Sequence, residues 1–157
     1  MRTIIRAAIK LAAAAAATAL AAAAAGGQGE KPLAYKEVPA AVRAAFEKQF
    51  PGAKVRGASS ETGERGTVYE VECDWRGRPH DITFRADGAL VAVEETIPPG
   101  EAPAAVMAAL RKQFPKAQVV RAEKITEGGV VSYEFQLKGA AKREAKFSPD
   151  GKLISAE

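Results

Sequence analysis

The stretch EVPAAVRAAFEKQFPGAKV at residues 37–55 returns as EAPAAVMAALRKQFPKAQV at residues 101–119, an offset of 64. Of these 19 aligned positions, 13 are identical. The proline, glutamate and Gln-Phe-Pro matches are difficult to obtain by chance, even in a chain this rich in alanine. A repeat at constant offset indicates two copies of one structural unit. The sequence therefore predicts a duplicated architecture.

Each copy opens with a short amphipathic helix. In the first copy Pro39 suits the first turn, where a missing N–H has no cost, and Pro51 ends the helix because the residue before a proline avoids the α region. Pro103 and Pro115 do the same in the second copy. The apolar residues of the first helix recur at the spacing of one helical face; they are Val38, Ala41, Val42, Ala45, Phe46 and Phe50.

Strand-like alternation follows each helix. Tyr69, Val71 and Cys73 alternate with acidic residues, which is the period of a sheet with one dry face. We expect strands at 53–60, 67–75, 78–86 and 89–97 in the first copy, and at 117–126, 131–138, 142–147 and 152–156 in the second. Asp87-Gly88 has the composition of a hairpin turn.

These patterns predict an α+β protein of two tandem helix-plus-antiparallel-sheet repeats, each ordered α-β-β-β-β. The helices should cover one sheet face and leave the other open. We divide the chain into a signal peptide (1–25), a flexible lead-in (26–36), repeat 1 (37–97) and repeat 2 (98–157). A single copy of this size is marginal alone, so we expect the two sheets to abut and share a core.

The first 25 residues have the pattern of an export signal. Arg2, Arg6 and Lys10 precede an uncharged, mostly alanine run, and Ala23-Ala24-Ala25 supplies the small residues of a cleavage site. The alternative is a retained membrane anchor, but the run is short for a span. We expect cleavage near Ala25, no membrane insertion afterwards, and a periplasmic or secreted protein.

Removal of this leader takes away three of the 23 basic residues and none of the 19 acidic ones, which leaves a net charge of +1. Such a balance does not favour nucleic-acid binding. One cysteine excludes an internal disulfide, and one cysteine with one histidine cannot supply a four-ligand zinc site. We expect no cofactor and no metal.

No catalytic constellation is evident. Cys73 and His80 could lie on adjacent strands, but Cys73 falls on the apolar side of its strand, where a thiol is inert packing. We therefore expect Cys73 to be buried and the protein not to be an enzyme.

Three features occur in a fixed order in each copy: a helix ending in Phe-Pro, a strand with Tyr-Glu at residues 69–70 and 133–134, and an Asp-Gly hairpin followed by an apolar residue. This set, from about Lys36 to Glu157, resembles the PepSY-like family of β-lactamase-inhibitor-like proteins of the bacterial envelope. The resemblance implies an exported α+β protein that binds or inhibits another protein. The matching residues look like fold determinants, so no active site is carried over; they are Phe50, Tyr69, Phe84 and Leu90.

The remaining candidate site is the open sheet face. The residues predicted to meet a partner there are Glu70, Glu72, Asp74, Trp75, Arg85, Glu134 and Lys138. For Trp75, core packing is the alternative. We expect a non-enzymatic protein-binding module that could inhibit an envelope hydrolase or peptidase. A structural or sensory envelope protein without a dedicated target is the alternative.

Overall fold

A computed structural model describes residues 28–157, so the predicted signal peptide and its cleavage near Ala25 lie outside the described residues. The elements are β1 (Gln28–Leu33), η1 (Tyr35–Glu37), α1 (Ala40–Gln49), β2 (Lys54–Gly63), β3 (Gly66–Trp75), β4 (Arg78–Arg85), β5 (Leu90–Ile97), η2 (Pro99–Glu101), α2 (Ala104–Gln113), β6 (Gln118–Glu127), β7 (Val130–Lys138), β8 (Glu144–Phe147) and β9 (Leu153–Ala156). The predicted α+β class is confirmed, as is the order of one helix followed by four strands in each copy.

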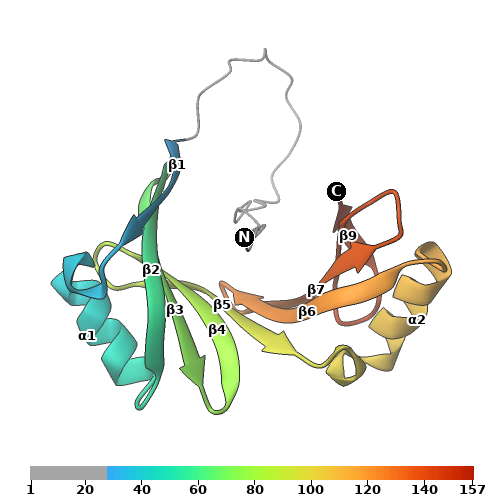
Figure 1. Ribbon diagram of the computed structural model, residues 1–157, viewed down its shortest axis with the longest axis horizontal. Coiled ribbons are helices and arrows are strands. Elements are labelled where there is room, and N and C mark those ends of the chain that lie inside the picture. The colour runs from blue at the N-terminus through green and yellow to red at the C-terminus, as the bar shows by residue number, and fades with distance from the viewer. Residues whose placement is uncertain (1–27) are drawn as a thin grey trace.

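The strands form one antiparallel sheet in which each strand neighbours the next in the chain, from β1 to β9 (Figure 1). The expectation of two abutting sheets is therefore wrong. β5 pairs with β4 on one edge and with β6 on the other. β5 is the last strand of the first copy. It also precedes η2 and α2 in the same way that β1 precedes η1 and α1, so it occupies the position of a first strand in the second copy. One ladder thus runs through both copies.

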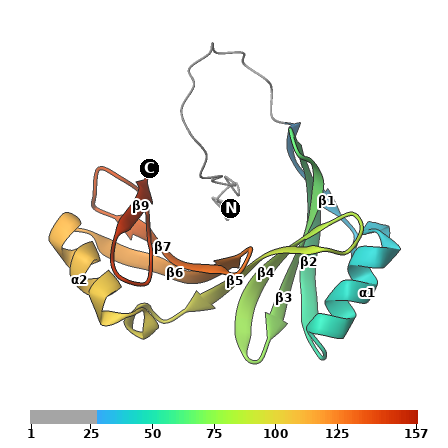
Figure 2. The same ribbon diagram turned by 180° about the vertical axis from the view of Figure 1, so that it is seen from behind.

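The register of the sheet carries apolar residues of both copies onto one face. Residues directly opposite one another in a ladder share a face. Val71 pairs with Ile82, which pairs with Val93. The same face continues through β6 and β7, where Ala122 lies opposite Phe135. Figures 1 and 2 show the sheet bent into an arch with α1 and α2 on its outer side.

Each helix buries its apolar stripe against its own half of the sheet. In α1 the buried residues are Val42 and Phe46, and in α2 they are Val106 and Leu110. Pro39 and Pro103 lie one position earlier than expected, at the N-caps, and each carbonyl oxygen accepts the first helical hydrogen bond. The helices end where Pro51 and Pro115 follow, as predicted.

The core is divided in two, which corrects the expectation of a shared one. The first cluster joins α1 to β2, β3 and β4, and the second joins α2 to β5, β6, β7 and β8. Because β5 and β6 pair edge to edge, both clusters lie on the same face but beside one another. The ladder, more than a common core, holds the two copies together.

The stretch 26–36, predicted to be a flexible lead-in, is corrected by the structure from residue 28 onward. β1 pairs antiparallel with β2, with Lys31 opposite Ser60 and Leu33 opposite Ala58. The prediction failed because this stretch is polar and contains glycine and proline, which suggests a loop. An edge strand tolerates Pro32, since an N–H is not needed on its unpaired side.

Both Asp-Gly hairpins press against the first turn of a helix. Gly88 and Gly151 have φ values of +86° and +85°. A Cβ at Gly88 would lie 2.7 Å from the Ala41 carbonyl oxygen, and one at Gly151 would lie 2.6 Å from that of Ala105. Only glycine allows both the left-handed conformation and this approach.

We predict that Gly88→Ala lowers the free energy of unfolding by roughly 2–3 kcal/mol, because it combines a strained φ with a clash against backbone. Urea denaturation measures this. Gly63→Ala is the matched control, since Gly63 is outside the left-handed region and a Cβ there meets nothing within 4 Å. Equal stability of the two variants would show that the hairpin does not rest on the helix.

Candidate functional site: an acidic seam between the two repeats

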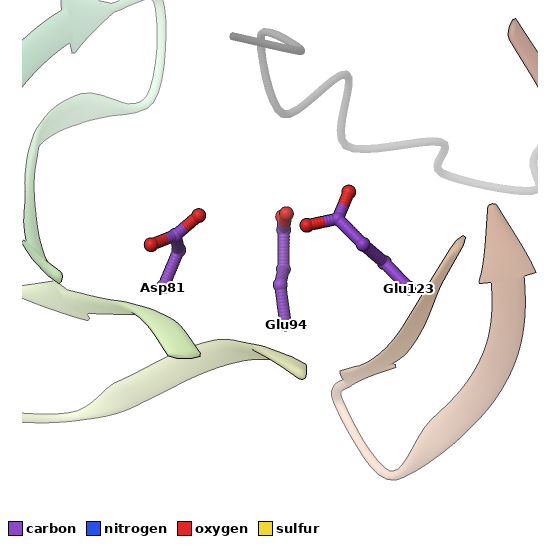
Figure 3. Close-up of side chains that lie close together, drawn as sticks. All are labelled: Asp81, Glu94 and Glu123. Carbon is purple, nitrogen blue, oxygen red and sulfur yellow. The ribbon is translucent and has the colours of Figure 1, made fainter. Parts of the chain in front are cut away.

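Three carboxylates meet where the two copies join. Asp81 of β4 lies opposite Glu94 of β5, and Thr96 of β5 lies opposite Glu123 of β6. One oxygen of each carboxylate lies within 4.8 Å of the others. Figure 3 shows Glu94 between the other two, with all three side chains standing on the same side of the strands. We call Asp81, Glu94 and Glu123 the acidic seam.

The acidic seam lies on the face opposite the two apolar clusters, which we call the polar face. Strand alternation places it there: Ile82 and Val93 are on the helix side, so Asp81 and Glu94 point the other way. Glu123 is 4% exposed. Asp81 and Glu94 are partly buried, so the carboxylates of the seam are poorly hydrated.

Arg121 is the cation at the seam. Its Nη2 lies 2.6 Å from Glu123 Oε1 and 3.3 Å from Asp81 Oδ2, and it donates a hydrogen bond to Thr96 Oγ1 at 3.1 Å. The pair with Asp81 ties the second copy to the first. Arg56 approaches from β2, with Nε 3.3 Å from Asp74 and Nη2 3.9 Å from Asp81.

Glu94 has no such partner: no lysine or arginine among residues 28–157 forms an ion pair with it. Burial raises the pKa of Glu94 to about 8, helped by the negative charges of Glu123, Glu134 and Glu70, and of Asp81. Burial likewise raises the pKa of Glu123 to about 7, although Arg121 opposes the shift. The seam therefore retains protons near neutral pH.

Glu134 extends this crowding onto β7. It lies directly opposite Glu123 in the ladder. Its Oε1 atom is buried and has no hydrogen-bond partner. Burial raises the pKa of Glu134, with Lys146 acting in the opposite sense. A buried acceptor without a donor costs free energy, so Glu134 adds to the cost of the site.

The seam offers oxygen ligands, the donor type preferred by hard divalent cations. However, the Arg121 guanidinium already contacts two of the three carboxylates. A divalent ion would have to share these oxygens with it. The geometry is better suited to holding protons, or to exchanging them for a cationic group that reaches Glu94.

The predicted partner-binding residues divide between the two faces. Glu70, Glu72, Asp74 and Arg85 alternate with core residues of β3 and β4 and lie on the polar face, as do Glu134 and Lys138 on β7. Of these, Glu70 and Glu134 are close enough to raise the pKa of Glu94. Arg85 and Lys138 are exposed at strand ends.

Trp75 is the exception, because it points to the helix side. Its ring packs edge-on against Phe50 and His80, with centroids 5.1 Å and 5.6 Å away, and Nε1 donates to the Pro51 carbonyl oxygen at 3.2 Å. Arg76 covers it at 4.1 Å. Trp75 therefore serves the packing of α1 in this structure.

The residues of the acidic seam are not among those that the sequence pattern predicts. Asp81 and Thr83 alternate with the apolar Ile82 and Phe84 in the predicted strand 78–86, and that signal could have singled out Asp81. Glu94 is brought opposite Asp81 by the pairing of β4 with β5, whose register shifts between Thr83 and Phe84. Arg121 and Glu123 are placed by the pairing of β5 with β6 and by the bulge between Val119 and Arg121.

Cys73 and His80 lie opposite one another on β3 and β4, and both are buried. Predicted burial of Cys73 is confirmed, and burial raises the pKa of its thiol to about 11. Nδ1 of His80 is 3.0 Å from the Arg78 carbonyl oxygen. A thiol held in its neutral form is a poor nucleophile.

Comparison with known proteins places the chain in a family. The family model described as "Putative beta-lactamase-inhibitor-like, PepSY-like" matches residues 28–78 and again 67–155. The chain belongs to this PepSY-like family. A search of curated proteins finds no match. The resemblance inferred from the Phe-Pro, Tyr-Glu and Asp-Gly motifs is confirmed.

Several solved structures share the fold. A protein described as BLIP-like from Bacteroides fragilis is 19% identical, with a TM-score of 0.60 and coverage of 76% of this chain and 85% of its own. A protein described as "putative periplasmic" from Bacteroides eggerthii is 20% identical, with a TM-score of 0.64 and coverage of 76% of this chain and 88% of its own. A DUF2874 protein from Bacteroides uniformis is 22% identical, with a TM-score of 0.61 and the same coverage.

Neither α1 nor α2 has the length or the apolar composition to span a bilayer, and residues 28–157 contain no other helix that does.

We predict that the free energy of unfolding falls as the pH rises from 5 to 8. Glu94 and Glu123 have pKa values near 8 and 7 in the fold, against 4.5 for the ordinary side chain. Between these values the folded state binds more protons than the unfolded chain, so stability is lost as the pH rises. Urea titrations across this range measure the slope.

Glu94→Gln mimics the protonated side chain. It should reduce the slope by up to about 1.4 kcal/mol per pH unit and make the protein more stable than wild type at pH 8. Glu64→Gln, at an exposed carboxylate of the β2–β3 turn, is the control and should leave the slope unchanged. Equal slopes for the wild type and Glu94→Gln would contradict the assignment.

Proposed function

We propose that the protein is a periplasmic, non-enzymatic binding module that docks another envelope protein on its polar face. The observation that carries this proposal is the acidic seam. Crowded, partly buried carboxylates lower the stability of a fold, and perturbed pKa values cluster where a protein meets its ligands. The acidic seam lowers the stability of the sheet, so a role in binding explains its presence better than a structural role does.

The bend of the sheet supports the same function. With both helices on the outer side of the arch, we take the polar face as the open one, formed by strands of both copies (Figures 1 and 2). A continuous surface across two copies could reach the area of an ordinary protein interface. The charged residues along it would set specificity and association rate.

The comparisons and the leader support an envelope location. A structural relative is described as "putative periplasmic", and residues 1–25 have the composition of an export signal. The family description names β-lactamase-inhibitor-like proteins, which favours binding or inhibition of another protein over catalysis. We extend the proposal to an envelope hydrolase or peptidase as the target.

A sensory role is the second candidate, and one observation favours it. Glu94 and Glu123 change their protonation near neutral pH. A sheet whose central charge changes in this range could report the acidity of the envelope without a dedicated enzyme target.

Site-specific photo-crosslinking in native envelope tests the proposal. Crosslinkers at Arg85 and Lys138 sample the polar face, and crosslinkers at Lys48 and Lys112 on α1 and α2 are the controls. We expect the polar-face positions to capture one protein, saturably and in competition with unlabelled protein. Capture from the helix positions alone would contradict the proposed face.

The charge of the face is tested by reversing Glu70, Glu72 and Asp74 to Lys together. Because these side chains flank the seam, we expect at least a tenfold loss of capture with unchanged circular dichroism. Reversal of Glu47 and Glu64, which are exposed outside the polar face, is the matched control. Undiminished capture by the triple variant across a salt series would show that acidic contacts are not used.

A further inference from the structure

We propose that the polar face receives a basic segment of the partner, with a lysine or arginine side chain that pairs with Glu94 of the acidic seam. This inference rests on the proposed function and specifies the chemistry of the partner. It follows from the charges of the face and from how they are already paired.

The polar face carries more carboxylates than cations around Glu94, and they come from every strand packed near it. Around Glu94, the other carboxylates are Asp81 of β4, Glu123 of β6, Glu134 of β7 and Glu144 of β8, and the cations are Arg56 of β2, Arg121 of β6 and Lys146 of β8. Glu70 and Glu72 of β3 also face this region but have interactions of their own, so they are not counted in the excess. This excess of negative charge is complementary to a basic segment.

The cations nearest the seam are already committed. Arg121 contacts Asp81 and Glu123, and Arg56 contacts Asp74 and Asp81. Neither forms an ion pair with Glu94. On the other side of Glu123, Glu134 Oε1 is buried and accepts no hydrogen bond. Two acceptors on one face therefore lack the donors that buried carboxylates require.

A lysine or arginine side chain supplies what is missing. An ammonium group carries three N–H donors and a guanidinium five, so either can supply the donors that Glu94 lacks. The aliphatic stem of such a side chain can lie in a partly buried site while its charge meets the acceptors. A small divalent ion would compete with the Arg121 guanidinium for the same oxygens, which makes it the weaker candidate.

Proton release should accompany binding. Burial and the neighbouring charges hold a proton on Glu94 at neutral pH. A cation that pairs with Glu94 favours the ionised carboxylate and displaces this proton. When one proton is released for each bound segment, affinity rises about tenfold per pH unit below the pKa of Glu94. A merely non-specific attraction to acidic residues would depend on salt without releasing a proton.

Isothermal titration calorimetry tests the inference with the exported protein. The probe is a 12-residue peptide of alternating lysine and serine, and the control peptide has glutamate in place of lysine. Titrations in phosphate and in Tris at pH 7 give the number of protons released. We expect the lysine peptide alone to bind, to release up to one proton, and to bind about tenfold more tightly at pH 7 than at pH 6.

Glu94→Gln should abolish the proton release and lower the affinity for the lysine peptide about tenfold. Glu134→Gln should also lower this affinity. Glu64→Gln, the control, should change neither the proton release nor the affinity. Failure of the lysine peptide to bind would overturn the inference. So would equal binding and equal proton release in Glu94→Gln, or preferential binding of Ca²⁺ that excludes the peptide.

The two proposals can fail separately. If the polar face captures a partner but the lysine peptide does not bind, the proposal of a basic segment is wrong and the proposal of a binding module stands. Absence of any capture from the polar face would overturn the binding module itself.

Discussion

Pairing of β5 on both of its edges is the constraint on which the rest of the structure depends. Because the strand belongs to two ladders at once, the face of every residue in the first copy fixes the face of every residue in the second. The apolar residues of both copies therefore meet their helices on one side. The charged residues of both copies accumulate on the other, and the most crowded point is where the copies join.

The crowding of these charged residues destabilises the fold, and the pairing of the strands compensates for this loss of stability. Each unit by which a carboxyl pKa is raised represents about 1.4 kcal/mol of disfavoured ionisation. Two separate apolar clusters and continuous backbone hydrogen bonds hold the strands in place while the seam remains under electrostatic strain. Arg121 relieves part of it through Asp81 and Glu123, and a proton on Glu94 relieves part of the remainder.

Much of the fold could be predicted, because local patterns determine it. The prolines that bracket α1, the alternation around Val71 and Cys73, and the Asp-Gly hairpins each have a direct local cause. The joining of the copies could not be predicted in the same way. It depends on which strands pair across Pro98-Pro99-Gly100 and on bulges such as the one beside Val119. The seam depends on that pairing and on the shifted register of β4 with β5, so Glu94 and Glu123 were not predicted from the sequence, whereas Glu70 and Glu134 were.

The most direct test of this account is carbon-13 NMR of the glutamate side-chain carboxyl groups across pH 3–10, with signals assigned through Glu94→Gln and Glu123→Gln. The account predicts midpoints for Glu94 and Glu123 near 8 and 7, because burial and neighbouring carboxylates raise both pKa values. Titration of both groups near the ordinary value of 4.5 would contradict it. Such a result would mean that the seam is hydrated and unstrained, and would remove the physical reason for assigning function to this face.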